Sequence, residues 1–195
     1  NSIEDCSLKN NSKQIILGDG NINSPIMIIG EAPSDDEYKT GLTFSGEVGD
    51  LLKKMLIAKE EDFEQIKTIF YKHKKWFPHV RTDYMRRMIA KEQMILEEGI
   101  LITFHHAKRK QTIGDVHVKK GDTVLHQIAN AEPGSGNAKV ILHNFFEWCP
   151  RDVFLSVRSD NTKACKFYEQ TGMKLVGETS WARGTLPGKV FVMRK

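Results

Sequence analysis

The stretch that most constrains this sequence lies near its end, at residues 153–181. Residues 153–157 form a short apolar run that is typical of a buried strand. A polar turn follows, and then a helix is expected over residues 162–171, with Gly172 and a second strand-like run at residues 175–181 behind it. A strand, a helix and another strand in this order predict that the chain mixes helices with a sheet.

The preceding part of the sequence fits the same fold class. Two helices are expected there, one with Asp62 as its N-cap and one that starts near Thr82, whose hydroxyl has similar capping chemistry. The whole order predicts an α/β chain with a mixed sheet. The first helix should bury Phe63, Ile66, Ile69 and Phe70, strands are expected at 94–105, 112–118, 123–131 and 189–193, and a further helix at 138–148.

The helix at residues 162–171 carries a recognisable motif. Six positions match N-x-x-A-x-x-F-Y-x-x-x-G-[FM], and they are Asn161, Ala164, Phe167, Tyr168, Gly172 and Met173. In this respect residues 61–195 resemble the GNAT N-acetyltransferases. The resemblance implies the GNAT acyl-CoA N-acyltransferase fold, with acetyl-CoA as co-substrate and an amine as acceptor.

A glycine-rich turn at residues 133–138 leads from a strand into a helix. Such a turn lets backbone N–H groups converge on an anion, although glycine turns at this place are also common for purely structural reasons. The turn resembles the GNAT pyrophosphate loop, Q/R-x-x-G-x-G/A, at Gly136 and Ala138. Pro133 stands where Gln or Arg is usual, so the turn has one backbone donor fewer.

The GNAT resemblance also implies roles for individual residues. The backbone at Ile128, Ala129 and Asn130 would pair with the pantetheine amides. Tyr168 would protonate the leaving thiolate, because a phenol stays protonated at neutral pH; outside this motif it would be read as a core tyrosine. The other cofactor-binding residues implied are Gly134, Ser135, Gly136, Asn137 and Ala138 around the pyrophosphate, and Asn161, Ala164 and Phe167 along the cofactor arm.

The general base is open at this level. The GNAT resemblance implies a base on or beside the strand at 123–131, or a water relay; His126 and Glu132 are the nearest candidates, and Glu98 and His105 lie on earlier strands. Each of them also suits a structural role. The acceptor is equally open among small molecules, protein amines and modified nucleobases, and residues 181–188 lie where GNAT enzymes often wall the acceptor site.

Residues 1–60 carry a second resemblance. Residues 30–33 read GEAP and residues 41–52 read GLTFSGEVGDLL, which resembles the opening motifs of iron–sulfur uracil-DNA glycosylases. This implies that Phe44 corresponds to the uracil-stacking phenylalanine and that the acidic loop corresponds to the water-activating one. Only Cys6 matches a cluster cysteine, so this chain cannot supply four cysteine ligands. We therefore expect a partial, non-catalytic segment, with a strand at 26–29 and a helix at 49–59.

Charge and composition bear on partners. Residues 1–60 hold six Lys/Arg and ten Asp/Glu, a charge of −4, whereas residues 61–195 hold 23 and 15, a charge of +8. The basic part is either a solvated surface or contacts a polyanion, which would be the phosphates of coenzyme A or nucleic acid. The alternative function is therefore a DNA-binding or DNA-repair module with a non-catalytic GNAT fold.

Three scattered cysteines and an ordinary hydrophobic content of 39% favour a reducing, cytoplasmic location. No apolar run is long enough for a membrane span, and no segment resembles a signal peptide.

The histidine spacing indicates no metal site, since His105 and His106 are strand neighbours that point to opposite faces. A homodimer is left open, and the first residue, Asn1, indicates a missing or removed upstream segment.

Overall fold

The computed structural model describes residues 35–41, 43, 46, 49, 57–134 and 136–195. The chain divides into two units, Asn1–Leu56 and Ile57–Lys195. In the first unit the described helix is α2 (Asp35–Thr40), while the expected strand at 26–29, Phe44 and most of the expected helix at 49–59 lie outside the described residues. The prediction that this helix extends to residue 59 is wrong, because Ile57 forms an antiparallel bridge with Ile95.

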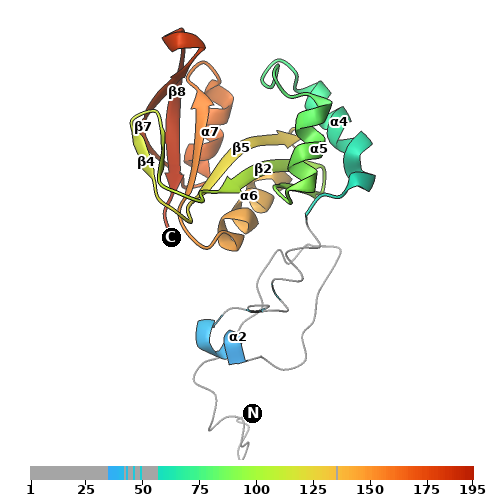
Figure 1. Ribbon diagram of the computed structural model, residues 1–195, viewed down its shortest axis with the longest axis vertical. Helices are drawn as coiled ribbons and strands as arrows, with labels where there is room; N and C mark the ends of the chain where they lie inside the picture. The colour runs from blue at the N-terminus through green and yellow to red at the C-terminus, as the bar shows by residue number, and fades with distance from the viewer. Residues whose placement is uncertain (1–34, 42, 44–45, 47–48, 50–56, 135) are drawn as a thin grey trace, which may run out of the picture. The chain divides into compact units, whose positions relative to one another are not determined.

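The second unit is built on a six-stranded sheet in the order β1-β2-β5-β6-β8-β7 (Figure 1). Neighbouring strands are antiparallel except β5 and β6, which run parallel. A second, two-stranded sheet is the hairpin of β3 and β4. The strands are β1 (Met94–Glu97), β2 (Ile100–His106), β3 (Gln111–Ile113), β4 (Val116–Val118), β5 (Thr123–Asn130), β6 (Val153–Arg158), β7 (Lys174–Trp181) and β8 (Leu186–Met193).

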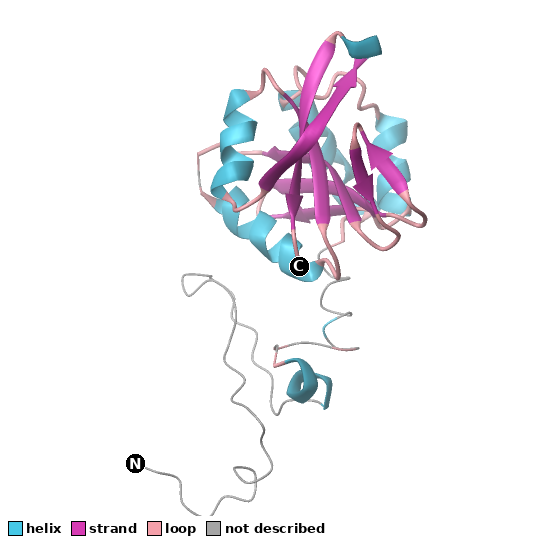
Figure 2. Cartoon of the chain, turned by 90° about the vertical axis from the view of Figure 1, so that its left-hand side faces the viewer, coloured by secondary structure: helices cyan, strands magenta, loops and turns pink. Residues whose placement is uncertain are grey.

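Helices cover both faces of the sheet (Figure 2). Alternate residues of a strand point to opposite faces, so Ile100 and Ile102 face α6 and α7, whereas Leu101 faces α4 and α5. A third, smaller cluster around Val124 and Phe154 lies against the β3–β4 hairpin. The helical segments are η1 (Glu60–Asp62), α4 (Phe63–Lys72), α5 (Thr82–Ala90), α6 (Asn137–Trp148), α7 (Thr162–Gln170) and η2 (Ala182–Gly184).

The inward face expected for the first helix is confirmed, since Phe63, Ile66, Ile69 and Phe70 are all buried. The capping chemistry is different from the expectation. Asp62 occupies the N-cap position, but its carboxylate accepts from the Lys59 N–H at 2.8 Å rather than from α4. Thr82 is the first residue of α5, and Arg81 stands at its N-cap.

Two segments that were each expected to form one strand form two antiparallel strands joined by a tight turn. The run at 94–105 turns at Glu98 and Gly99, which both have positive φ angles (46° and 74°), and the chain folds back as β2. The run at 112–118 turns at Gly114 and Asp115. Both misassignments have one cause: a turn of two residues, left-handed at Glu98 and Gly99 and at Gly114, interrupts the apolar pattern too briefly to be recognised in the sequence.

The β3–β4 hairpin packs on one face of the six-stranded sheet and contacts β7, the strand at one edge of that sheet. The Asp115 N–H donates to the Glu178 carbonyl at 3.3 Å, and the Glu178 N–H donates to the Asp115 carboxylate at 2.9 Å. A Cβ atom at Gly114 would lie 1.9 Å from the Glu178 carbonyl oxygen, so the hairpin docks only with glycine there.

Replacing Gly114 with alanine is therefore expected to destabilise the protein. The overlap with the β7 backbone should cost about 1–3 kcal/mol in the free energy of unfolding, in addition to backbone strain. Gly184→Ala is the matched control, because Gly184 also has a positive φ angle but nothing lies within 4 Å of its Cβ position. Urea denaturation measures both variants, and an equal loss in the two would contradict the docking.

Candidate active site

The parallel strands β5 and β6 separate after a short common stretch. They pair at Thr123↔Val153, Val124↔Phe154 and Leu125↔Leu155, and no further pair joins them within the described residues. Both strands nevertheless continue, β5 to Asn130 and β6 to Arg158. The facing edges beyond Leu125 are therefore outside the sheet ladder and can bind another molecule through backbone groups.

A β-bulge lies where the two strands separate. The register of β2 with β5 passes from Thr103↔Gln127 to Phe104↔Leu125, which leaves His126 as the additional residue. A bulge bends its strand and increases the local twist. The bulge thus accounts for the departure of β5 from β6 directly after Leu125, and it re-aims the His126 side chain.

His126 forms a pair with His105 of β2. His105 Nδ1 lies 2.7 Å from His126 Nε2, and the two rings stack with centroids 4.8 Å apart and an interplanar angle of 19°. At this distance one ring donates and the other accepts, so the two rings share one proton between them. The Gln111 side-chain amide, at the start of β3, lies 3.0 Å from His105 Nε2 and extends the chain of contacts.

The histidine pair stays uncharged at neutral pH. Burial by the surrounding protein, and secondly the His105 ring, lower the pKa of His126 to about 4, although part of the ring faces solvent. Burial also lowers the pKa of His105, against a smaller opposing effect of the Gln111 hydrogen bond. The uncharged pair therefore has one ring nitrogen outside their mutual contact that can accept a proton at neutral pH.

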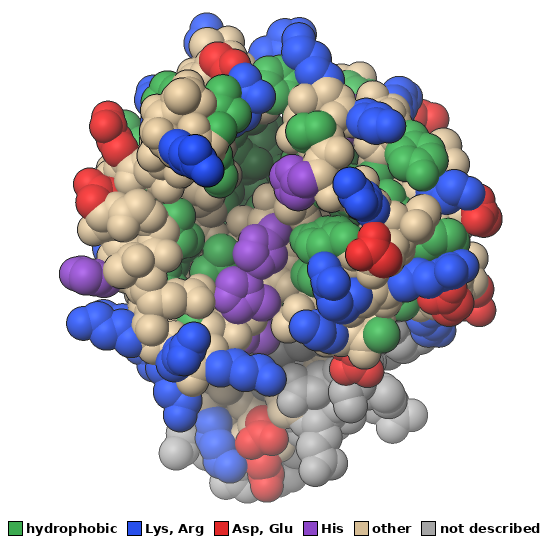
Figure 3. All heavy atoms as spheres, turned by 45° about the horizontal axis from the view of Figure 1, so that its top comes forward, with side chains coloured by type: hydrophobic (Ala, Val, Ile, Leu, Met, Phe, Trp, Pro, Cys, Tyr) green, Lys and Arg blue, Asp and Glu red, His purple; other side chains and the backbone are tan. Residues whose placement is uncertain are grey.

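The pair occupies the sheet face between α4–α5 and the β3–β4 hairpin. Its neighbour on one side is Gln127, whose Oε1 accepts from the Tyr84 hydroxyl of α5 at 2.8 Å and from Thr103. Its neighbour on the other side is Val124, which packs under the hairpin. Figure 3 shows histidine side chains gathered in a hollow between two lobes of this face.

Acidification is expected to weaken the fold through His126. The folded-state pKa of about 4 lies below the ordinary 6.5, so between these values the unfolded chain binds the proton more readily. Stability should therefore fall as the pH falls from 6.5 towards 4. Urea denaturation across this range measures the slope, which should flatten in His126→Gln but not in His117→Gln, a solvent-exposed control. An unchanged slope in His126→Gln would contradict this origin.

The glycine turn lies at the far end of β5. Gly134 and Gly136 both have positive φ angles, 103° and 86°, and Ser135 between them lies outside the described residues. Gly136 is the N-cap of α6 and has no side chain to cap it, so among the described residues the first N–H groups of this helix have no side-chain acceptor. In the part of the chain that the structure describes, nothing lies within 4 Å of a Cβ position at either glycine.

The motif residues of α7 have clear structural roles. Asn161 is the N-cap, with its Oδ1 accepting from the Ala164 N–H at 3.3 Å. Ala164 and Phe167 pack against the main core, and Gly172 ends the helix with a φ angle of 88°. Cofactor contacts by Asn161, Ala164 and Phe167 stay predictions.

Tyr168 is buried to 6% exposure between α7 and the sheet. Its ring lies 5.5 Å from the Phe167 ring and 6.0 Å from the Phe191 ring, between centroids. Burial raises its pKa well above the ordinary value, and the neighbouring Cys165 adds to this. The phenol is therefore protonated at neutral pH and lies on the opposite face of the sheet from His126.

The other base candidates lie away from the histidine pair. Asn130, which ends β5, is about 13 Å along the strand from His126, and Glu132 follows it as an exposed residue. Glu98 lies at the same end, in the turn beside Gly99, whose carbonyl accepts from Ala131. The structure thus brings His126 and His105 together and leaves both glutamates apart from them.

The cofactor-binding prediction for the end of β5 meets one competing contact. The Asn130 carbonyl accepts from His73 Nε2 at 2.7 Å, and the Ala131 carbonyl accepts from Lys72. Both donors belong to the end of α4. The roles of Ile128 and Ala129 stay predictions, and a pantetheine amide that pairs with the Asn130 carbonyl would share this acceptor with His73.

Sequence reasoning missed three residues around the opening. Gln111 contacts His105 of the histidine pair, and Tyr84 contacts Gln127, the residue that follows His126. Trp76, in the α4–α5 loop, lies over the end of β6, where the Arg158 guanidinium is 5.7 Å from the centre of its ring. Arg158 also pairs with Asp160 through Nε at 3.0 Å. The contacts of Tyr84 with Gln127 and of Trp76 with Arg158 join segments far apart in the sequence, and the contact of Gln111 with His105 depends on how the turn between them folds, so no local pattern predicts them.

Comparison with known proteins gives two findings of different kinds. The family model of the uracil DNA glycosylase superfamily matches residues 17–134, more than half of the chain. The chain belongs to the uracil DNA glycosylase superfamily. A curated relative, the type-4 uracil-DNA glycosylase of Thermotoga maritima, is 39% identical over 51 residues, which are 26% of this chain and 27% of the relative. The chain thus spans about a quarter of the length of this glycosylase.

The fold of this superfamily member from Ile57 onward is that of the GNAT acetyltransferases. A GNAT acetyltransferase from Streptococcus agalactiae superposes with a TM-score of 0.59 at 13% identity, over 71% of this chain and 93% of that one. One from Bacillus cereus gives 0.56 at 17%, over 71% and 94%. NAA60 of Arabidopsis thaliana in complex with acetyl-CoA gives 0.51 at 15%, over 70% and 94%. The GNAT fold expected from the sequence is confirmed.

Among the described residues, no helix has the length and apolar character to cross a membrane. The same residues include no group of three or more metal-ligating side chains. His105 and His106 take different partners, as expected for strand neighbours: His106 Nδ1 lies 2.9 Å from Thr123 Oγ1.

Proposed function

We propose that this chain is an N-acetyltransferase that transfers the acetyl group of acetyl-CoA to a primary amine by direct attack. The observation that carries the proposal is the opening between β5 and β6, which starts at the His126 bulge. The GNAT fold of the neighbours, one of which was solved with acetyl-CoA, supports it.

The residues around the opening fit acetyl-CoA. The free edge of β5 at Ile128 and Ala129 offers backbone groups of the kind that the amides of pantetheine pair with. The uncapped start of α6 and the two positive-φ glycines offer N–H groups to a pyrophosphate. Acetyl-CoA would supply an acyl carbon activated as a thioester.

His126 is the proton acceptor in this proposal. In the competent arrangement His126 carries its proton on Nε2 and donates to His105 Nδ1, which leaves a lone pair on His126 Nδ1. His105 then carries its proton on Nε2 and donates to the Gln111 amide, turned to present its oxygen. The two ends of an amide have the same shape, so this turn needs no other rearrangement.

Tyr168 serves the leaving group from the other face of the sheet. The amine nitrogen attacks the thioester carbon, the C–S bond breaks, and the Tyr168 hydroxyl gives its proton to the thiolate. The proton lost by the amine goes to His126 Nδ1. Solvent then returns Tyr168 and His126 to their starting protonation, so that one proton is lost by the amine and one is gained by the thiolate.

An acetyl-transfer assay tests the proposal. The full chain is incubated with radiolabelled acetyl-CoA and a panel of small amines, peptides with free N-termini or lysines, and DNA containing amine-modified bases. The proposal requires label on at least one class of acceptor. Absence of transfer to all three, together with absence of acetyl-CoA binding, would reject it.

The superfamily membership favours a second candidate function. The chain would be a DNA-binding or DNA-repair module with a glycosylase-like N-terminal segment and a non-catalytic GNAT fold. This candidate rests on the family match and on the 51-residue similarity to a type-4 glycosylase. We expect no uracil release from this chain, because it has three cysteines rather than the four that an iron–sulfur cluster takes. An assay on uracil-containing single-stranded DNA measures this, and released uracil would show that the expectation is wrong.

A further inference from the structure

Five cations gather on two neighbouring turns at the end of the sheet away from the glycine turn. Lys108, Arg109 and Lys110 follow β2, and Lys119 and Lys120 follow β4. We call these five residues the basic rim. All five are exposed, and none forms an ion pair with another described residue. The turn residues beside them include no carboxylate from Ala107 to Lys110 or from His117 to Gly121.

Backbone hydrogen bonds hold the two turns together. The Ala107 N–H donates to the Asp122 carbonyl and the Gly121 N–H donates to the Ala107 carbonyl, both at 2.8 Å. The Lys119 N–H donates to the Asp122 carboxylate at 2.7 Å. The rim is therefore one preformed surface, and binding to it needs little ordering of the backbone.

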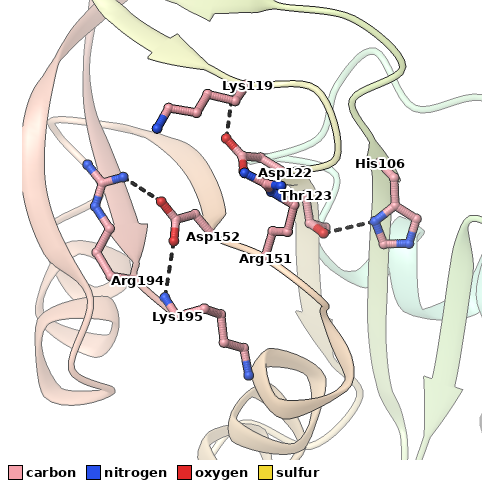
Figure 4. A network of polar contacts seen from close by, with 8 residues as sticks. All are labelled: His106, Lys119, Asp122, Thr123, Arg151, Asp152, Arg194 and Lys195. Atoms are coloured by element: carbon pink, nitrogen blue, oxygen red, sulfur yellow. Dashed lines mark hydrogen bonds and ion pairs between the residues drawn. The ribbon is translucent and has the colours of Figure 1, made fainter. Parts of the chain in front are cut away.

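The carboxylates next to the rim are already occupied (Figure 4). Asp122, whose side chain is 3% exposed, accepts from Lys119 N–H and pairs with Arg151 at 3.4 Å. Asp152 pairs with Arg194 at 2.5 Å and accepts from the Lys195 N–H at 3.1 Å. Both acids thus have an arginine partner, and the side chains of Arg151 and Arg194 stay more than half exposed beside the rim.

The composition of the rim favours phosphates over a protein partner. Protein interfaces have an apolar, often aromatic centre and are poor in lysine. The large hydrophobic side chains exposed in the described structure are Tyr71, Val140, Leu175, Val176 and Trp181, and none of them belongs to the two turns. A row of lysine and arginine without an apolar centre matches the backbone of a nucleic acid, which carries a dense line of negative charge.

We propose that the basic rim binds the phosphate backbone of nucleic acid without sequence preference. The rim consists of other residues than the acetyl-CoA opening: it lies beside Thr123 at the start of β5, about 10 Å from His126, where the opening begins, and about 23 Å from Asn130 at its far end. The proposal therefore goes beyond acetyl transfer and does not depend on it.

The test measures binding of the full chain to a fluorescein-labelled DNA duplex of arbitrary sequence by fluorescence anisotropy. Five neutralised phosphates predict a slope of about −4.5 for log affinity against log salt, which is roughly a 500-fold loss between about 50 and 200 mM KCl. Removing three rim cations in Lys108→Gln/Arg109→Gln/Lys110→Gln should reduce the slope to about −1.8 and weaken binding at low salt at least about tenfold.

The matched control removes the same charge elsewhere. Lys163, Lys166 and Lys174 are exposed on α7 and β7, and their triple change to Gln should leave the slope unchanged. Equal losses in both triple variants would overturn the proposal, because general charge would then explain binding. Undiminished binding by the rim variant would overturn it too, since another part of the chain would then bind the DNA. Displacement by polyglutamate of equal charge would indicate an acidic protein partner and would also overturn it.

Discussion

Tyr168→Phe is expected to lower kcat for acetyl transfer by about 10²–10⁴ while the Kd for acetyl-CoA changes little. The ring would keep its packing against Phe167 and Phe191, so only the hydroxyl that protonates the thiolate is lost. Steady-state kinetics with an identified acceptor and calorimetric titration of acetyl-CoA measure the two quantities.

Tyr71→Phe is the matched control for this prediction. Tyr71 is a half-exposed tyrosine on α4, and losing its hydroxyl should leave kcat unchanged. If Tyr168→Phe lowered stability but not kcat, Tyr168 would be a core tyrosine and the acid would lie elsewhere.

His126→Ala is expected to lower kcat by a similar factor, about 10²–10⁴, because the proton acceptor is removed. Imidazole added in solution should restore part of the lost rate, since it can enter the space left by the side chain. His117→Ala, at an exposed position of β4, should keep the wild-type rate and show no response to imidazole.

His105 acts through His126 in this mechanism and is a positioning residue. His105→Ala should cost less than His126→Ala, and adding it to His126→Ala should cost almost nothing more, because the two rings work as one unit. Kinetics of the two single variants and the double variant measure this coupling. Independent, additive losses would contradict the pair, and an unchanged rate in His126→Ala would remove His126 as the base.

Local patterns in the sequence were sufficient for much of the fold. The apolar spacing of Phe63, Ile66, Ile69 and Phe70 predicts a face that the structure buries. The motif around Tyr168 predicts a strand, helix and strand that the structure contains, with Asn161 at the cap. These features depend on neighbours within a few residues, which is why a single sequence reveals them.

The features that the sequence left hidden depend on pairing between distant strands. The bulge at His126 exists only relative to the register of β2, so nothing in the order of residues around it marks the position. The contact of Tyr84 with Gln127 joins a helix to a strand across 43 positions, and the contact of His105 with Gln111 depends on the fold of the turn between them. The sequence predicts the glycine turn at residues 133–138, but it does not predict the separation of β5 from β6 that forms the proposed acetyl-CoA site.

Binding of acetyl-CoA to the full chain is the measurement that tests the central claim most directly. Thermal unfolding is followed with increasing acetyl-CoA, and a ligand at about 100 times its Kd should stabilise the folded state by about 2.7 kcal/mol. The melting temperature should rise with acetyl-CoA concentration, and it should rise less in Gly136→Val, which crowds the start of α6. A melting temperature that stays constant up to millimolar acetyl-CoA would contradict the account.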